Sequence, residues 1–227
     1  MINHEHKVIF IHVPKCAGSS VFKFFNKDLK VSWRTPNYNV LYGWCPKRKI
    51  HLQHATTKQL IETELITEEQ WNSYYKFTIV RNPWDRAYSD YQWIMKDTGK
   101  RDSFKNFILK KGKFSKVLND VSVKEYRGDH LLNQTDFFDS KGEFKLDFVG
   151  RFENLKTDFS RVLKALNISE EFSNHEKKSV KKMSHYSDFY TSSYQKLVLD
   201  RYQNDVEHLD YAFEDRKKGI FKIKNFF

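Results

Sequence analysis

The run Lys7–Val13 (KVIFIHV) constrains the fold of this 227-residue chain more than any other segment. Its aliphatic, β-branched and aromatic side chains are continuous, which is typical of a central parallel strand buried on both faces. The segment Pro14–Gly18 ends the run, and Ser19 favours the start of a helix that reaches about Phe25. A strand, a short loop and a helix in this order predict the first unit of an α/β sheet.

Later segments repeat this order of strand and helix. Lys76–Val80 predicts a second strand, and Pro83 stands where a helix would begin. Phe148–Phe152 predicts a third strand, followed by an amphipathic helix over residues 155–166. The spacing of apolar residues predicts one long helix over residues 194–209. We therefore expect an α/β fold with a central, mostly parallel sheet flanked by helices.

Shorter elements are predicted between these units. A helix opens near His54 and continues through Ile61, and Thr67 with Gln70 has the spacing of a capping box. Ser103–Leu109 suggests a helix and Asp139–Gly142 a turn, although residues 98–146 carry the weakest pattern. No linker-like segment divides the chain, so we expect one domain over residues 1–227.

The charge and the cysteine content narrow the class of protein. The chain has 40 Lys and Arg against 29 Asp and Glu, a net charge of +11, which suits either an anionic partner or a well-solvated surface. Two cysteines, Cys16 and Cys45, argue against a disulfide-stapled secreted domain. The N-terminal apolar run is too short for a signal sequence or a membrane span, so we expect a cytoplasmic protein.

The loop after the first strand has the composition of an anion site. Small residues at positions 17–20 allow the backbone N–H groups to close around a phosphate or sulfate at a helix N-terminus. Lys15 adds a positive charge, and the hydroxyl groups of Ser19 and Ser20 add donors. The loop is not a Walker A motif, because Lys15 precedes Gly18. The alternative is a tight turn with a surface lysine.

A second motif, Arg81–Tyr91 (RNPWDRAYSDY), runs from the end of a strand into a helix. Arg81 can bind a phosphate with its guanidinium, and Ser89 can supply a hydroxyl to the same group. Arg86 precedes Ser89 by three residues, so both face the same side of the helix. The alternative is that Arg86 pairs with Asp85 or Asp90 while Arg81 only packs.

Together, VPKCAGSS and VRNPWDRAYSDY resemble the paired motifs that bind 3′-phosphoadenosine 5′-phosphosulfate (PAPS) in Golgi-type carbohydrate sulfotransferases and their bacterial relatives. The similar subgroup includes the heparan sulfate 2-O-sulfotransferases and the chondroitin sulfotransferases. The resemblance continues through HATTKQL, DFVGRFENL and YQNDVEHLDYAFE, and is weakest over residues 98–136.

The resemblance implies a P-loop-like domain that uses PAPS as co-substrate, releases PAP (3′,5′-ADP) and needs no metal. The acceptor it implies is a hydroxyl group on a sugar or glycan, with no nucleic-acid partner. The second motif would hold the 3′-phosphate through Arg81 and Ser89. Where this chain has Cys16 many relatives have Thr, and a thiol is the poorer donor. The first loop would hold the 5′-phosphosulfate through Lys15, Cys16, Ala17, Gly18, Ser19 and Ser20.

Sulfuryl transfer needs a base for the acceptor hydroxyl and positive charge on the leaving side. Histidine titrates near neutral pH, and His54 matches the position of the base in the relatives that the sequence resembles. We therefore predict His54 and Lys15 as catalytic residues, with His51 and Arg86 as substrate contacts. The alternative for His54 is that it caps the following helix. The other histidines, including His12 and His130, are interpreted as surface or core residues.

Several competing hypotheses remain open at this stage. A P-loop nucleotide kinase would need a metal-binding carboxylate after a strand, for which Asp147 is the candidate. A non-catalytic polyanion-binding protein would use the net charge, and a redox protein would use Cys16. The basic residues near the C-terminal third either approach the nucleotide or form a solvated run: Lys177, Lys178, Lys181 and Lys182.

Overall fold

A computed structural model describes residues 1–138, 144–172 and 185–217 of the chain. Two sequence predictions lie outside these residues: the turn at Asp139–Gly142, and the basic stretch Lys177–Lys182. Within the described residues no helix is long and apolar enough to cross a membrane.

The core of the fold is a four-stranded sheet in the order β1-β2-β5-β6. β2, β5 and β6 are parallel to one another, whereas β1 is antiparallel to β2. All four residues of β2 are buried, as predicted from its continuous apolar run. The predicted α/β class, with a mostly parallel sheet flanked by helices, is confirmed. The strands of this sheet are β1 (Ile2–Asn3), β2 (Val8–Ile11), β5 (Tyr75–Val80) and β6 (Phe148–Arg151), and β3 (Trp44–Cys45) pairs with β4 (Ile50–His51) in a separate hairpin.

The helices begin where local signals predict. Thr56 and Thr67 each form a complete capping box, with Gln59 and Gln70 respectively. Asn82 caps the helix that has Pro83 at its first position. The nine helices of the described residues are α1 (Gly18–Phe25), α2 (Thr57–Glu62), α3 (Glu68–Ser73), α4 (Pro83–Thr98), α5 (Phe104–Ile108), α6 (Ser115–Asn119), α7 (Leu155–Ala165), α8 (Ser192–Arg201) and α9 (Gln203–His208).

One helix prediction is wrong. The expected single helix over residues 194–209 is two helices, because the chain breaks at Tyr202, where φ is −121° and ψ is 31°. The apolar spacing continues across the break, so periodicity alone did not reveal it. The break turns the buried Asp205 toward the backbone N–H groups of Gln134 and Thr135, which donate to it at 2.8 and 3.0 Å.

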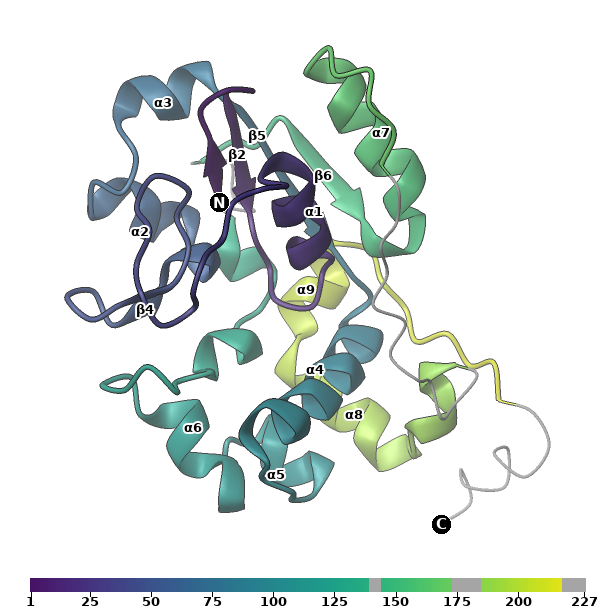
Figure 1. Ribbon diagram of the computed structural model, residues 1–227. Coiled ribbons are helices and arrows are strands. Elements are labelled where there is room, and N and C mark those ends of the chain that lie inside the picture. Colours follow the sequence, from purple (N-terminus) through teal and green to yellow (C-terminus); the bar gives the residue numbers. More distant parts are fainter. Residues whose placement is uncertain (139–143, 173–184, 218–227) are drawn as a thin grey trace.

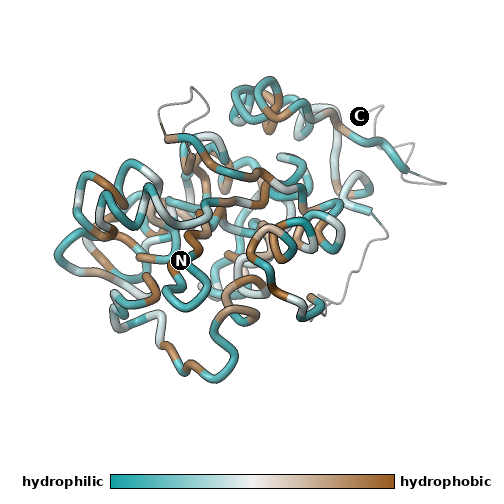
Figure 2. Tube along the Cα trace, turned by 90° about the horizontal axis from the view of Figure 1, so that it is seen from above, coloured by the Kyte–Doolittle hydropathy of each residue, from teal (hydrophilic) through white to brown (hydrophobic). Residues whose placement is uncertain are grey.

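The hydrophobic residues form two clusters. One contains the sheet with α1 and α7, and the other joins α4, α5, α6 and α8. Figure 1 shows α1 and α7 beside the sheet and the second group of helices at its lower end. In Figure 2 hydrophobic residues are concentrated along the central strands, while the outer helical turns are largely hydrophilic.

The sheet also decides where a ligand can bind. The chain leaves β2 and β5 at the same edge, because these strands are parallel. In open α/β sheets ligands bind outside the carboxyl ends of the strands. Both sequence motifs lie at this edge, one after β2 and the other after β5.

Candidate active site

The loop between β2 and α1 has the backbone of an anion-binding nest. Lys15 and Ala17 both have positive φ, of 69° and 62°. Alternation of left- and right-handed residues turns successive N–H groups toward one point. The N–H groups of Gly18 and Ser19 belong to the first turn of α1, where no intrahelical partner exists. The loop can therefore donate several hydrogen bonds to one anionic group.

Lys15 lies inside this site and not on an open surface. Its Nζ atom is 5.2 Å from the centre of the Trp93 ring. Burial lowers the pKa of Lys15, while the Asp90 carboxylate acts in the opposite direction. An anion bound in the loop would compensate for the partial desolvation of the ammonium group.

Cys16 faces away from solvent. Its Sγ atom lies 3.5 Å from Oε1 of Gln134 and 3.6 Å from the carbonyl oxygen of Pro14. Burial raises the pKa of the thiol to about 12, so it is a poor nucleophile. The environment of the Cys16 thiol thus disfavours the redox hypothesis. Only the backbone of Cys16 is left to contact a ligand in the loop.

The second motif is joined to the loop through Arg81. Its Nη1 donates to the carbonyl oxygen of Lys15 at 3.0 Å, and its Nε donates to Asp85 at 2.9 Å. The guanidinium also lies 4.1 Å from the centre of the Phe152 ring. Ser89, the other residue of this motif, lies on α4 and is half-buried.

Arg86 occupies a different position from the expected one. It is only 2% exposed, and its guanidinium donates to the backbone carbonyls of Pro14, His130 and Leu132. The partners considered from sequence, Asp85 and Asp90, bond to Arg81 and His130 instead, and the nearest carboxylate to Arg86 is Asp205 at 3.9 Å. Arg86 therefore ties the loop, residues 130–132 and α9 together, and offers no exposed surface for an acceptor.

His54 lies in a short turn, η1 (Leu52–His54), which immediately precedes the capped start of α2. The alternative that His54 caps this helix is wrong, because Thr56 provides the cap. The Nδ1 atom of His54 is 2.6 Å from Oδ2 of Asp129. A carboxylate only accepts, so Nδ1 carries the hydrogen and Nε2 keeps a free lone pair.

Burial lowers the pKa of His54 more than the adjacent Asp129 raises it. Burial opposes the charge on Asp129, but His54, through its charge and its hydrogen bond, holds the pKa of that carboxyl below its usual range. His54 is therefore a neutral imidazole at neutral pH, in the tautomer that a base requires.

His12 connects His54 to the loop. β2 ends at Ile11, one residue before His12, so this imidazole stands at the carboxyl edge of the sheet. Its ring centre is 4.9 Å from that of His54. A Cβ atom on Gly18 would lie 1.7 Å from the His12 Nε2, so the ring packs directly against the first residue of α1. His12 thus contacts both His54, the candidate base, and Gly18 of the anion loop.

A pocket of about 340 Å³ opens beside His54. His51 is at its wall, with Nε2 3.1 Å from the carbonyl oxygen of Lys124, and burial lowers its pKa to about 4. Its lining includes basic, acidic and apolar side chains. The lining residues are Arg48, Lys49, Ile50, His51, His54, Gln59, Val121, Tyr126, Asp129 and Leu132.

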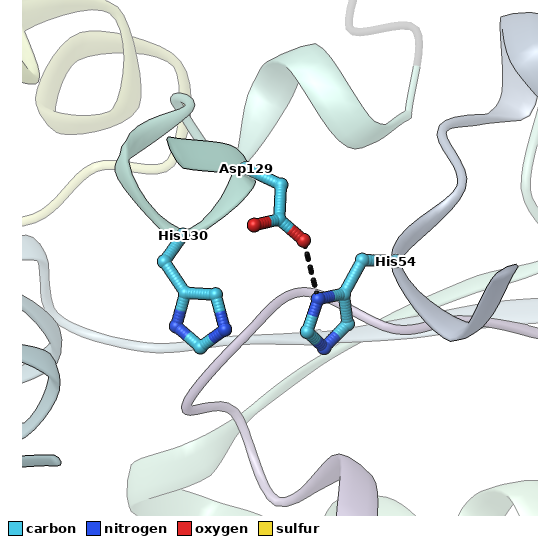
Figure 3. A group of neighbouring side chains, drawn as sticks. All are labelled: His54, Asp129 and His130. Atoms are coloured by element: carbon cyan, nitrogen blue, oxygen red, sulfur yellow. Dashed lines mark hydrogen bonds and ion pairs between the residues drawn. The ribbon is translucent and has the colours of Figure 1, made fainter. Parts of the chain in front are cut away.

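Three residues of this site were not assigned to it from the sequence: His12, Asp129 and His130. Figure 3 shows Asp129 and His130 beside His54. Asp129 and His130 come from η3 (Gly128–Leu131), which lies 75 residues after His54 in the chain. The sequence GDH has no spacing that marks it as catalytic. His130, interpreted from the sequence as a surface or core residue, is buried and lies beside His54, with 5.0 Å between ring centres.

Comparison with known proteins identifies the family of the chain. The model of the sulfotransferase family matches residues 1–212. No curated protein and no solved structure matches the chain. The chain therefore belongs to the sulfotransferase family, whose fold is P-loop-like, and it is a PAPS-dependent sulfotransferase. Sulfuryl transfer by such an enzyme implies PAPS and a hydroxyl acceptor.

Proposed function

We propose that this sulfotransferase transfers the sulfuryl group of PAPS to a carbohydrate hydroxyl by in-line displacement, with His54 as the base and Asp129 as its positioning residue. The observation that carries the proposal is the 2.6 Å contact between His54 Nδ1 and Asp129. It leaves Nε2 free to accept the hydroxyl proton as the acceptor oxygen attacks sulfur.

The donor would occupy the edge where both motifs meet. The loop Lys15–Ser20 would hold the 5′-phosphosulfate through its N–H groups, the Lys15 ammonium and the hydroxyl groups of Ser19 and Ser20. Lys15 would stabilise the charge that develops on the departing PAP. Arg81 and Ser89 would hold the 3′-phosphate, and Arg81 would then share its N–H groups between that phosphate and Asp85.

The acceptor would enter the 340 Å³ pocket, whose wall includes both His51 and His54. A base and several polar side chains in the lining of one pocket suit a sugar ring that presents one hydroxyl to Nε2. In this arrangement His51 lies against the acceptor. Arg86 has no such role in the proposal, and instead positions the loop. We propose that the whole chain acts as one domain.

The kinase hypothesis receives less support. Its candidate metal ligand, Asp147, accepts from the backbone N–H of Lys76 at 2.7 Å and pairs with the Lys76 ammonium at 3.1 Å. Lys76 and Phe148 are at the amino ends of β5 and β6. Asp147 therefore stands at the edge of the sheet opposite the anion loop, too far away to serve a phosphate bound there.

Calorimetric titration with 3′,5′-ADP tests the donor site. We expect binding by the wild type, and loss of binding in Lys15→Ala and Arg81→Ala. Lys23→Ala and Arg101→Ala are matched controls, because Lys23 and Arg101 are exposed. A folded wild-type protein that does not bind 3′,5′-ADP would contradict the donor site and favour the polyanion-binding hypothesis.

The base is tested separately, with saturating PAPS and a panel of sugar acceptors. His54→Gln removes the free Nε2 lone pair, so turnover should fall by about 10²- to 10⁴-fold while 3′,5′-ADP binding persists. His208→Gln, at an exposed position of α9, is the control. Unchanged turnover in His54→Gln would assign the base to another group.

A further inference from the structure

His54, Asp129 and His130 form a compact set of metal-ligand types beside the anion loop. One imidazole nitrogen of each histidine and one oxygen of Asp129 all lie within 4.8 Å of one another. Figure 3 shows the edge of the His130 ring turned toward His54, with the Asp129 carboxylate between them. The set draws on two segments that lie far apart in the sequence, η1 and η3.

Two polar atoms of this set are buried without a hydrogen-bond partner among the described residues: Nε2 of His130 and Oδ1 of Asp129. His130 is only 4% exposed. A buried polar group without a hydrogen bond is destabilising, so such atoms usually have a ligand or a water molecule as partner. Both atoms belong to residues of this set, so one ligand shared by the three side chains would give each atom a partner.

The surroundings of His130 are those of a metal-binding histidine. Its Nδ1 is 2.7 Å from Oδ1 of Asp90, so Nδ1 carries the hydrogen and Nε2 presents a lone pair. The Trp93 ring stacks on it, with 4.6 Å between ring centres and 5° between planes, and fixes its orientation. A carboxylate that orients the far side of an imidazole is the usual outer partner in metal sites.

We propose that the chain binds a divalent transition-metal ion of the Zn²⁺ type through His54, Asp129 and His130, and that the bound ion inhibits sulfuryl transfer. Two imidazoles and a carboxylate are a ligand set that zinc accepts, with a fourth position open. Bonds of about 2.0–2.2 Å require the three ligands to move inward by a fraction of an ångström. An ion on Nε2 of His54 would occupy the lone pair that accepts the proton. An ion on Nδ1 would break the hydrogen bond between His54 and Asp129 that keeps this lone pair on Nε2. Either event removes the base. The inhibition rests on the proposed function of His54, whereas the binding does not.

Titration of the untagged full chain with zinc chloride tests the binding. We expect one Zn²⁺ per chain, with the affinity reduced at least about 10-fold in His130→Gln and about 10- to 100-fold in Asp90→Asn. His208→Gln is the matched control and should bind like the wild type. Equal affinity in the wild type and in folded His130→Gln, or absence of binding in the folded wild type, would overturn the site.

Cobalt gives a measurement that needs no variant. Co²⁺ held by these three ligands and one water should show the strong visible absorption of a four-coordinate ion, and Zn²⁺ should displace it. A spectrum that stays that of the hydrated ion would overturn the site.

Turnover with PAPS then tests the inhibition. Zinc should inhibit the wild type at concentrations near its dissociation constant, and the inhibition curve of His130→Gln should shift by the same factor as its affinity. Zinc bound at this site without inhibition would overturn the link to His54. A wild type that binds zinc but never turns over PAPS would contradict the proposed function and leave the metal site standing.

Discussion

The pair His54 and Asp129 determines how the reaction should respond to pH. Burial lowers the pKa of His54 below its usual 6.5, so its imidazole stays neutral to a lower pH than that of an exposed histidine. Base catalysis needs the neutral form, and kcat/KM reports on the free enzyme. We therefore expect the acid limb of the kcat/KM profile to fall below pH 6.5, measured with PAPS and an acceptor at constant ionic strength.

Asp129→Asn affects both roles of the carboxylate. It removes a charge that raises the pKa of His54, and its NH2 group can donate to Nδ1, which favours the tautomer that has no lone pair on Nε2. The acid limb should therefore move to lower pH, while kcat falls by about 10²-fold. Movement of the limb to higher pH would mean that another group titrates there.

At the scale of single residues, the sequence predicted the site residues that directly follow a strand. It missed the residues that only the folded chain brings close to His54. Lys15 and Arg81 are recognisable because a buried strand precedes each of them, which places both at one edge of the sheet. Asp129 meets His54 across 75 residues of chain. No local pattern encodes that contact, because η3 is a single turn whose position depends on Arg86 and on the packing of Trp93.

Arg86 connects α4 to neighbouring segments of the chain through the hydrogen bonds of its guanidinium. Arg86→Met would leave the buried carbonyls of Pro14, His130 and Leu132 without their donor, and Asp205 without its nearest cation. We expect a loss of about 3–5 kcal/mol in the free energy of unfolding, measured in urea. Arg161→Met, which removes an exposed guanidinium on α7, should lose less than about 1 kcal/mol. Equal losses in the two variants would contradict the role of Arg86.

The two capping boxes offer a comparison between equivalent elements. Thr56→Ala and Thr67→Ala should each cost about 1 kcal/mol of stability, because each removes one helix cap. Only Thr56 lies next to the turn that carries His54, so only Thr56→Ala should also lower kcat. Thermal unfolding and turnover of both variants measure this, and an equal loss of kcat in the two would contradict it.

At the scale of elements, the sequence succeeded where a helix or strand carries its own signals. Thr67, Pro83 and the amphipathic pattern of α7 gave starts that agree with the structure to within about a residue, whereas the helix expected to open near His54 begins at Thr57. The break between α8 and α9 escaped prediction because its cause is tertiary. The hydrogen bonds of Asp205 to residues 134 and 135 favour the turn, whereas the local sequence favours a continuing helix.

For the whole molecule, the net charge of +11 and the anion loop make separable predictions. Heparin should bind the protein in a strongly salt-dependent way, because that binding draws on many scattered basic residues. Lys15→Ala removes one half-buried cation, so the salt concentration that elutes the protein from heparin should hardly change. The same variant should lose 3′,5′-ADP binding, and a large shift in heparin elution would place both ligands at one site.

The contact between Gly18 and His12 makes these two positions interdependent. Gly18 has an ordinary helical backbone, so what excludes a side chain here is space: the Cβ of even an alanine would overlap the imidazole. Gly18→Ala in the wild type should push His12 toward His54 and damage loop and base together. The same substitution made after His12→Ala should be far milder, so the double variant should lose less stability than the sum of the two single variants, which is a negative interaction energy in a double-mutant cycle. A substitution at Gly18 should therefore follow a substitution at His12. In the opposite order the first variant, Gly18→Ala alone, is the most damaged of the three.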